Sequence, residues 1–92
     1  MLEQMGCDLL VVGGGMAGLT AAAKAAERGA RVIVVEKSGR TGGSAALSGG
    51  IIWTIQSARK LNFHTRGRPD LGALMVDEYP EVIRWLRSRV CI

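Results

Sequence analysis

The chain has 92 residues, 48% of them apolar, and a formal net charge of +4 at neutral pH. This length allows one small domain, and the apolar content favours a folded core over disorder. The basic residues are scattered, with almost no interleaved aromatic residues, and no stretch approaches the ~18 apolar residues of a membrane span. We therefore expect neither nucleic-acid binding nor a membrane span.

The first part of the chain has the pattern of a strand, a turn, a helix and a second strand. Cys7–Val12 is a short apolar run that suits a parallel strand covered on both faces. Met16–Arg28 is rich in alanine and stops before Gly29, which predicts a helix with a glycine just past its end. Arg31–Glu36 predicts the second strand, and together these elements make a βαβ unit. The expected apolar stripe of the helix is Leu19, Ala22, Ala23 and Ala26.

The sequence after the second predicted strand indicates a loop followed by helices. Residues 38–50 are small and rich in glycine, so we expect a loop with a short helix at Ser44–Leu47. Residues 54–68 predict an irregular basic segment whose histidine, His64, contacts solvent. Pro69–Glu78 and Pro80–Arg89 predict two helices, because a proline disfavours helix at the residue before it. The second helix should bury the face that carries Val82, Ile83, Leu86 and Val90, with Trp85 off that stripe.

The first glycine cluster lies at the predicted turn between the first strand and the helix. Gly13, Gly15 and Gly18 match the G-x-G-x-x-G dinucleotide fingerprint in its required context. The first glycine permits the tight turn, the second lets the backbone approach a pyrophosphate, and the third allows close packing of helix on strand. Glu36 follows Gly15 by 21 residues, as the fingerprint requires of a carboxylate that binds ribose hydroxyls. Such a carboxylate would repel a 2′-phosphate, which argues against an NADP-type ligand.

A second glycine cluster, within Thr41–Gly50, begins just past the second strand. In open α/β sheets, ligands bind at the carboxyl ends of the strands, where this cluster would lie. Its glycines let the backbone run against a ligand, and Ser44 and Ser48 add small hydroxyl donors. A cofactor that extends across the domain needs such a cluster, which favours FAD over a nicotinamide. Lys37 would lie at the adenosine end, either as a ligand contact or as an ordinary solvated lysine.

The segments DLLVVGGGMAGLTAAAKAAERGARVIVVEK and TGGSAALSGGIIW, with Glu78-Tyr79-Pro80-Glu81 further on, resemble one enzyme family. These are the flavoprotein subunits of fumarate reductase and succinate dehydrogenase, and especially the 3-ketosteroid dehydrogenases. The resemblance implies an α/β fold with a Rossmann-like, glutathione-reductase-like βαβ FAD-binding unit. This unit would be incomplete and followed by the glycine-rich loop and C-terminal helices. The enzymes transfer hydride at CH–CH bonds next to a carbonyl or carboxylate.

The resemblance also implies which residues contact the cofactor. The first cluster would form the pyrophosphate turn, and Glu36 would bind the ribose. Gly43, Ser44 and Ala45 would contact the pyrophosphate and ribityl region, and Ser48, Gly49 and Gly50 would lie near the isoalloxazine ring. The full candidate set is Gly13, Gly14, Gly15, Ala17, Gly18, Glu36, Lys37, Gly42, Gly43, Ser44, Ala45, Ser48, Gly49 and Gly50.

The chain departs from this family in two ways. The respiratory members attach FAD through a histidine in the second cluster, where this chain has Gly43, so we expect non-covalent FAD. Family members are also several times longer. Residues 1–92 would thus be a partial FAD-binding domain, the N-terminal fragment of a larger flavoprotein, without catalytic residues and inactive alone. A small-molecule substrate would bind only to the complete enzyme.

Two other readings stay open at this point. One is a fragment of an NAD-dependent oxidoreductase, and the other is a stand-alone nucleotide-binding module without catalysis. Cys7 and Cys91 lack metal-type spacing, which predicts two reduced thiols and no metal site. The N-terminus lacks a basic segment before its apolar run, so we expect no signal peptide and a cytoplasmic protein.

Overall fold

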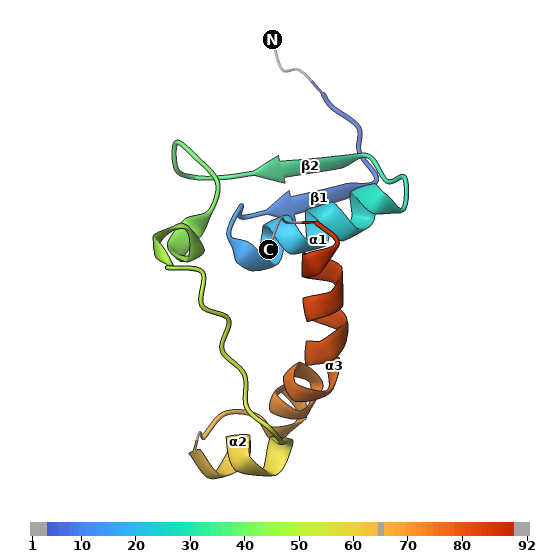
Figure 1. Cartoon of the computed structure of the whole chain (residues 1–92). Helices are drawn as coiled ribbons and strands as arrows, with labels where there is room; N and C mark the ends of the chain where they lie inside the picture. The colour runs from blue at the N-terminus through green and yellow to red at the C-terminus, as the bar shows by residue number, and fades with distance from the viewer. Residues whose placement is uncertain (1–3, 65, 90–92) are drawn as a thin grey trace. The chain divides into compact units, whose positions relative to one another are not determined.

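The computed structural model describes residues 4–64 and 66–89, and of residues 62–64 it describes only the backbone. The chain divides into two compact units, Met1–Ile51 and Ile52–Ile92. The N-terminal unit holds strand β1 (Leu9–Val12), helix α1 (Met16–Glu27), strand β2 (Val32–Val35) and a 3-10 helix, η1 (Gly43–Leu47). The C-terminal unit holds helices α2 (Ala58–His64) and α3 (Pro69–Arg87) (Figure 1).

The N-terminal unit is a small α/β structure. Strands β1 and β2 are parallel, with Leu9 opposite Val32 and Val12 opposite Val35, and α1 connects them and packs on the sheet (Figure 1). Two contacts between Asp8 and Arg31 join the starts of the two strands. The side chains form an ion pair, and the Arg31 backbone N–H donates to Asp8 Oδ2 over 2.8 Å. The predicted strand–helix–strand order is therefore confirmed, with each strand shorter than expected.

Helix α1 ends at the glycine that the sequence indicated. Gly29 has φ 84°, its N–H donates to the Ala26 carbonyl over 3.0 Å, and the Ala30 N–H donates to the Ala25 carbonyl over 3.1 Å. This pair of bonds is a Schellman motif, which satisfies carbonyls that the end of a helix would otherwise leave unpaired. Only glycine adopts the left-handed conformation without a steric cost, so Gly29 turns the chain into β2.

The predicted apolar stripe of α1 is wrong in its orientation. Of its four residues only Ala22 is half-buried, and Leu19 is 36% exposed. The half-buried positions are instead Gly18, Ala22 and Ala25. Both sets have helical spacing, so periodicity alone could not choose between them. Gly18 decides, because its missing side chain is what lets the helix approach Val11 on β1.

The described residues cover one face of the sheet and leave the other open. Val11 is buried, whereas Leu10, Val12 and Val35 are exposed, and Val12 is 81% exposed. Side chains alternate between the faces of a strand, so these three lie on the face away from Val11. The expectation of a strand covered on both faces therefore holds for one face only in the part of the chain that the structure describes.

The C-terminal unit corrects two predictions. Helix α2 lies inside the segment expected to be irregular, and it buries Leu61. Ser57 begins it: the Leu61 N–H donates to the Ser57 carbonyl over 3.1 Å, and the Lys60 N–H donates to Ser57 Oγ over 3.2 Å. A serine that caps a helix start is a recognisable local signal, which the sequence reasoning passed over.

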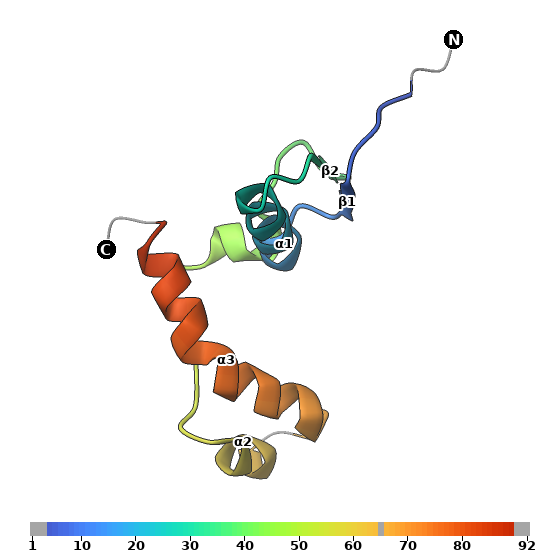
Figure 2. The same cartoon turned by 90° about the vertical axis from the view of Figure 1, so that its right-hand side faces the viewer.

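The second correction is that α3 is one helix and not two. It begins at Pro69, as predicted, but it continues through Tyr79 and Pro80 (Figure 2). Figure 2 shows the helix axis bending part-way along, which is the usual response to a proline within a helix. The half-buried residues Gly72, Val76, Tyr79, Ile83 and Leu86 keep a helical spacing across the proline. This continuous face outweighs the preference of the residue before a proline for extended backbone.

One side-chain prediction in α3, that for Val82, is wrong. Val82, expected on the buried face, is 47% exposed, whereas Trp85 is half-buried, with the Arg89 guanidinium 5.9 Å from its ring centroid. The side chain of His64, and all of Val90 and Cys91, lie outside the described residues, and the predictions that concern them stay predictions. Among the described helices, none is both long and apolar enough to cross a membrane.

Candidate nucleotide-binding site

The turn between β1 and α1 depends on two of its glycines for its own geometry. Gly13 has φ 107°, a conformation that favours glycine, and its N–H donates to the Val35 carbonyl over 2.8 Å. A Cβ atom added at Gly18 would lie 1.9 Å from the Gly13 carbonyl oxygen and 3.1 Å from Val11 Cγ1. The first glycine therefore makes the turn, and the third lets the helix contact both the turn and the strand.

Gly15 differs from both, because a Cβ atom added there would meet no atom of the described chain within 4 Å beyond its neighbours in sequence. Its φ of −83° is accessible to any residue, so neither the backbone nor the packing of the described chain requires glycine. The open space beside it is the space that a close ligand would fill. This is the role that the fingerprint assigns to its second glycine.

The N-terminal end of α1 is free to bind an anion. The first intrahelical bond runs from the Leu19 N–H to the Gly15 carbonyl over 2.9 Å, so the N–H groups of Met16, Ala17 and Gly18 precede it. Among the described residues no side chain caps this end, and the first turn holds no acidic residue. Unpaired N–H groups and the positive end of the helix dipole together attract phosphate.

Glu36 lies directly past β2 and its carboxylate faces the turn. Its Oε1 accepts the Gly14 N–H over 3.0 Å, and its Oε2 accepts the Ser38 N–H over 2.6 Å. Hydrogen bonds from the Ser38 N–H and then from the Gly14 N–H hold the pKa of Glu36 below its usual range. The carboxylate therefore stays ionised, and each oxygen keeps a lone pair for a further donor such as a ribose hydroxyl.

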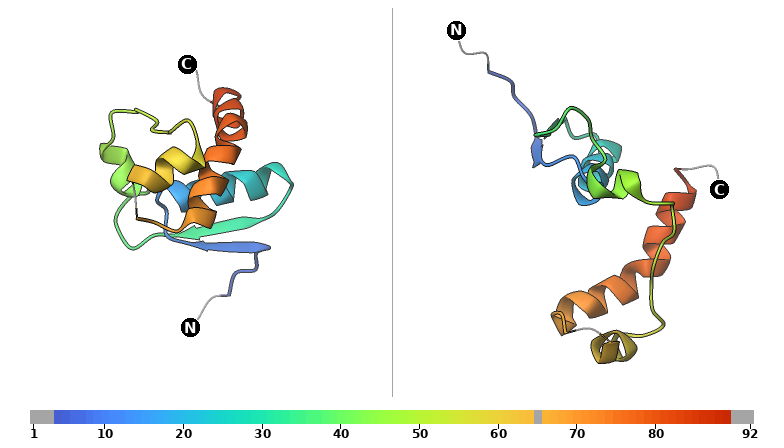
Figure 3. Two further views of the ribbon diagram at one scale, coloured as in Figure 1. Left: turned by 90° about the horizontal axis from the view of Figure 1, so that it is seen from below. Right: turned by 90° about the vertical axis from the view of Figure 1, so that its left-hand side faces the viewer.

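The second glycine cluster meets the first. The Gly42 N–H donates to the Gly14 carbonyl over 2.7 Å, and a Cβ atom added at Gly43 would lie 3.2 Å from Gly15 Cα. Gly42 has φ 120° and Gly43 has φ 55°, so both adopt backbone conformations that favour glycine. Figure 3 (right) shows η1, in green, beside the start of α1, with which it is in contact.

The end of the second cluster leads away from this contact. Ser44 and Ala45 lie within η1, which ends when the Ser48 N–H donates to the Ala45 carbonyl over 3.0 Å. Ser48 Oγ then accepts the Gly50 N–H over 3.0 Å, and Ser48, Gly49 and Gly50 are exposed. The structure therefore brings Glu36, Gly42 and Gly43 to the first cluster, whereas Ser48–Gly50 follow the end of η1 and are exposed.

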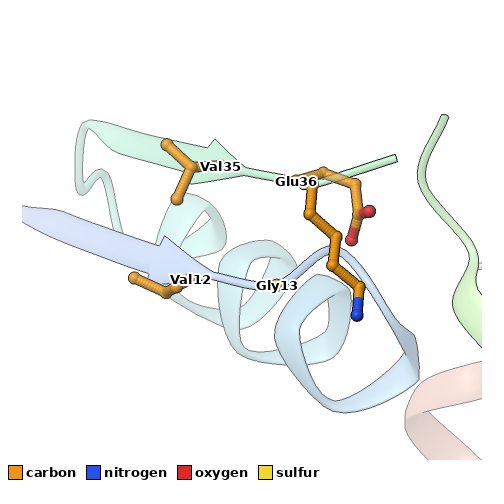
Figure 4. Close-up of a pocket in the computed structure, with 5 residues that line it drawn as sticks. Val12, Gly13, Val35 and Glu36 are labelled. Atoms are coloured by element: carbon orange, nitrogen blue, oxygen red, sulfur yellow. The ribbon is translucent and has the colours of Figure 1, made fainter. Parts of the chain in front are cut away.

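An open depression of about 400 Å³ lies at the carboxyl ends of the two strands. Val12, Gly13, Val35, Glu36 and Lys37 line it (Figure 4). The two valines give it an apolar floor, and Glu36 and Lys37 supply opposite charges at its edge. The predicted residue Lys37 thus lines the depression, although it is exposed to solvent.

Two residues at the site were not among the predicted ones. Ser38 donates its N–H to Glu36 and its hydroxyl to the Arg40 carbonyl over 2.7 Å. Thr41 places its Cγ2 only 2.8 Å from the position that a Cβ atom at Gly14 would occupy. The position of Ser38, two residues past a carboxylate, was a usable signal, because such a serine can form a local turn. The contact of Thr41 has no signal in the sequence.

A family model described as an FAD binding domain matches residues 8–91. The chain belongs to this family. The cofactor predicted from the two glycine clusters, FAD, is therefore confirmed as the ligand of the family. The residues present fit it: Gly15 leaves room where a side chain would intrude, the end of α1 is uncapped, and Glu36 is ionised.

Individual relatives of this FAD-binding domain are named as dehydrogenases or as an oxidoreductase. The chain is 53% identical over 51 residues to "4-oxocyclohex-2-ene-1-carboxylate 5-dehydrogenase" of Sinomonas cyclohexanicum, a match covering 55% of the chain and 9% of the relative. It is 55% identical over 47 residues to "3-oxosteroid 1-dehydrogenase" of Rhodococcus opacus, covering 51% and 9%. It is 33% identical over 99 aligned residues to "NADH:fumarate oxidoreductase" of Klebsiella pneumoniae, covering 89% and 11%.

The matched segments are thus about a tenth of each of these relatives. The predicted resemblance to fumarate reductases and ketosteroid dehydrogenases, limited to an N-terminal FAD-binding segment, is confirmed. No solved structure matches the chain.

Proposed function

We propose that this chain holds the ADP and pyrophosphate part of FAD within a flavin-dependent oxidoreductase that acts on CH–CH bonds next to a carbonyl or carboxylate. The observation that carries the proposal is the meeting of the two glycine clusters beside Glu36. It brings together an ionised carboxylate, an uncapped helix end and an open glycine surface. Those are the three features that a ribose joined to a pyrophosphate requires.

Each part of the site has a proposed role. Glu36 accepts the ribose hydroxyls, with Lys37 beside it at the depression between the strand ends. Gly15 and the N–H groups of Met16, Ala17 and Gly18 receive the pyrophosphate. Gly43, Ser44 and Ala45 contact the pyrophosphate and ribityl chain, and Ser48–Gly50 contact the flavin ring.

The FAD is proposed to bind without a covalent bond. The family position that carries the attaching histidine corresponds to Gly43, whose φ is 55° and whose added Cβ atom would lie 3.2 Å from Gly15 Cα. The backbone and the neighbouring turn both disfavour a side chain there. Precipitating the FAD-loaded protein with acid tests this: the flavin should stay in the supernatant, and flavin that remains with the pellet would refute it.

The substrate class rests on the relatives. Their names place an oxo group or a carboxylate in each compound acted on. When bound, the flavin ring supplies hydride transfer, and the protein must position the substrate against it. The candidate site of this chain holds no proposed catalytic residue. We therefore expect no turnover from these 92 residues alone.

The proposal extends to the domain. Residues 1–92 are the N-terminal part of a glutathione-reductase-like FAD-binding domain in a larger, cytoplasmic flavoprotein. The exposed apolar face of Leu10, Val12 and Val35 supports this, because such a face is stable only when another element covers it. Sequencing the gene beyond codon 92 tests it, since a stop codon there would favour a stand-alone nucleotide-binding module.

The direct test is a pair of calorimetric titrations of the protein, one with FAD and one with NAD. FAD should bind more tightly, and Glu36→Ala should weaken FAD binding about tenfold, the cost of losing one charge-assisted hydrogen-bonding group. A matched control is Glu78→Ala, which removes an exposed glutamate from α3. Tighter binding of NAD would transfer the proposal to a nicotinamide-dependent oxidoreductase.

A further inference from the structure

Gly14 occupies a variable position of the G-x-G-x-x-G fingerprint, yet it is the most enclosed glycine of the site. It is buried, whereas Gly13 and Gly15 are half-buried. Its N–H donates to Glu36 Oε1 over 3.0 Å and its carbonyl accepts the Gly42 N–H over 2.7 Å. The backbone N–H and C=O of Gly14 are thus bonded to two different segments, the residue that follows β2 and the second glycine cluster.

Thr41 closes the remaining side of Gly14. A Cβ atom added at Gly14 would lie 2.8 Å from Thr41 Cγ2, 3.3 Å from Thr41 Cβ and 3.5 Å from Glu36 Cγ. The first distance is shorter than carbon atoms tolerate. Gly15, one residue on, has open space in the same test. The requirement for glycine therefore comes from the protein at Gly14 and from the ligand side at Gly15.

We propose that Thr41 is a positioning residue, and that it forms with Gly14, Glu36 and Gly42 a latch that holds the two glycine clusters together before the cofactor binds. This deepens the proposed function, on which its effect on FAD rests. The latch fixes the distance between the Glu36 carboxylate, proposed to bind the ribose, and the second glycine cluster, proposed to contact the ribityl chain. Holding both in place beforehand reduces the ordering that binding would otherwise require.

The test introduces a steric clash at Gly14 and then removes it by a second substitution at Thr41. Gly14→Ala puts a methyl group against Thr41 Cγ2, and Thr41 is β-branched and stiff about χ1, so the Gly42 segment must separate from the turn. We expect FAD to bind about tenfold more weakly. Gly14→Ala with Thr41→Ser lacks the clashing methyl and should recover most of the affinity. Gly14→Ala with Thr41→Val keeps a branched side chain and should recover none.

A second readout separates the latch from FAD binding itself. In the protein without ligand, amide hydrogen exchange at Gly42 reports the bond to the Gly14 carbonyl. Exchange should be about tenfold faster in Gly14→Ala and should return toward the wild-type rate with Thr41→Ser. If the wild type binds no FAD, the proposed function fails, and this exchange experiment still decides the latch.

Two results would overturn the latch: equal recovery with serine and valine at residue 41, or unchanged Gly42 exchange in Gly14→Ala. Should Gly14→Ala not fold, as judged by circular dichroism, Thr41→Gly is the second variant. It deletes the contact and adds no atom, and Gly42 exchange should then rise roughly threefold to fivefold, the equivalent of one buried methyl group. No rise in exchange would equally contradict the proposal.

Discussion

Gly15 and Gly18 offer a matched pair of substitutions in one turn. Both are fingerprint glycines, and alanine adds the same single methyl group at each. At Gly18 that methyl group would lie 1.9 Å from the Gly13 carbonyl oxygen, and at Gly15 no atom of the described residues beyond its sequence neighbours would lie within 4 Å of it. We therefore expect Gly18→Ala to damage the fold and Gly15→Ala to damage binding alone.

The magnitudes follow from these contacts. Carbon and oxygen atoms ordinarily approach to about 3.3 Å, so at Gly18 the helix or the turn must move by more than ~1 Å. Moving α1 away from Val11 on β1 forfeits the close packing of the unit and should cost about 3 kcal/mol, the upper part of the range for overpacking. At Gly15, replacing a glycine N-cap by alanine costs about 0.5–1 kcal/mol of stability. Alanine also lowers the conformational entropy of the unfolded chain, which stabilises the folded state by a similar amount.

The assay is thermal unfolding by circular dichroism beside calorimetric titration with FAD. Gly15→Ala should melt within a few degrees of the wild type and bind FAD at least about tenfold more weakly, because its methyl group would occupy the space proposed for the pyrophosphate. Gly18→Ala should melt far lower, with or without FAD. Equal melting temperatures in the two variants would refute the steric argument. Wild-type affinity in Gly15→Ala would refute the placing of the pyrophosphate.

Three further predictions concern single contacts. The pKa of Glu36 is lower in the folded protein than in the unfolded one. Its contribution to stability is therefore complete above the unfolded pKa of about 4.3 and is lost as pH falls through the folded pKa. The urea midpoint of Glu36→Gln should fall less steeply with acid than that of the wild type, and an unchanged dependence on pH would contradict this expectation. Pro80→Ala should restore a bond to the Val76 carbonyl and stabilise α3 by about 2 kcal/mol in thermal melts; no gain would mean that the bend is unstrained. Ser57→Ala should cost α2 about 1 kcal/mol, seen as faster amide exchange at Lys60, unless another group caps the helix.

Much of the N-terminal unit could be read from local sequence. The order of β1, α1 and β2, the stop at Gly29 and the spacing from Gly15 to Glu36 all follow from short-range patterns. Each of these depends on one residue's backbone preference or on a period within one element, and such information is local. The FAD family followed from the two glycine clusters and is confirmed by the family match.

The errors share a different property. The stripe of α1 was misplaced because two faces have acceptable spacing, and the contact of Gly18 with Val11 chose between them. The break predicted at Pro80 did not occur because α3 keeps one half-buried face on both sides of the proline. In both cases packing between elements overrode a local preference.

By itself, the sequence determined that a glycine turn, a helix and a carboxylate follow one another at the spacing of a nucleotide-binding site. Backbone sterics favour glycine at the first position of such a turn, and the ligand favours the second glycine and the carboxylate, so the pattern can be recognised from the sequence alone. Only the tertiary structure decided that Gly14 is bonded to Glu36 on one side and to Gly42 on the other, beneath Thr41. Those contacts join residues 22 or more positions apart, and their geometry depends on how β2 and η1 fold back onto the turn.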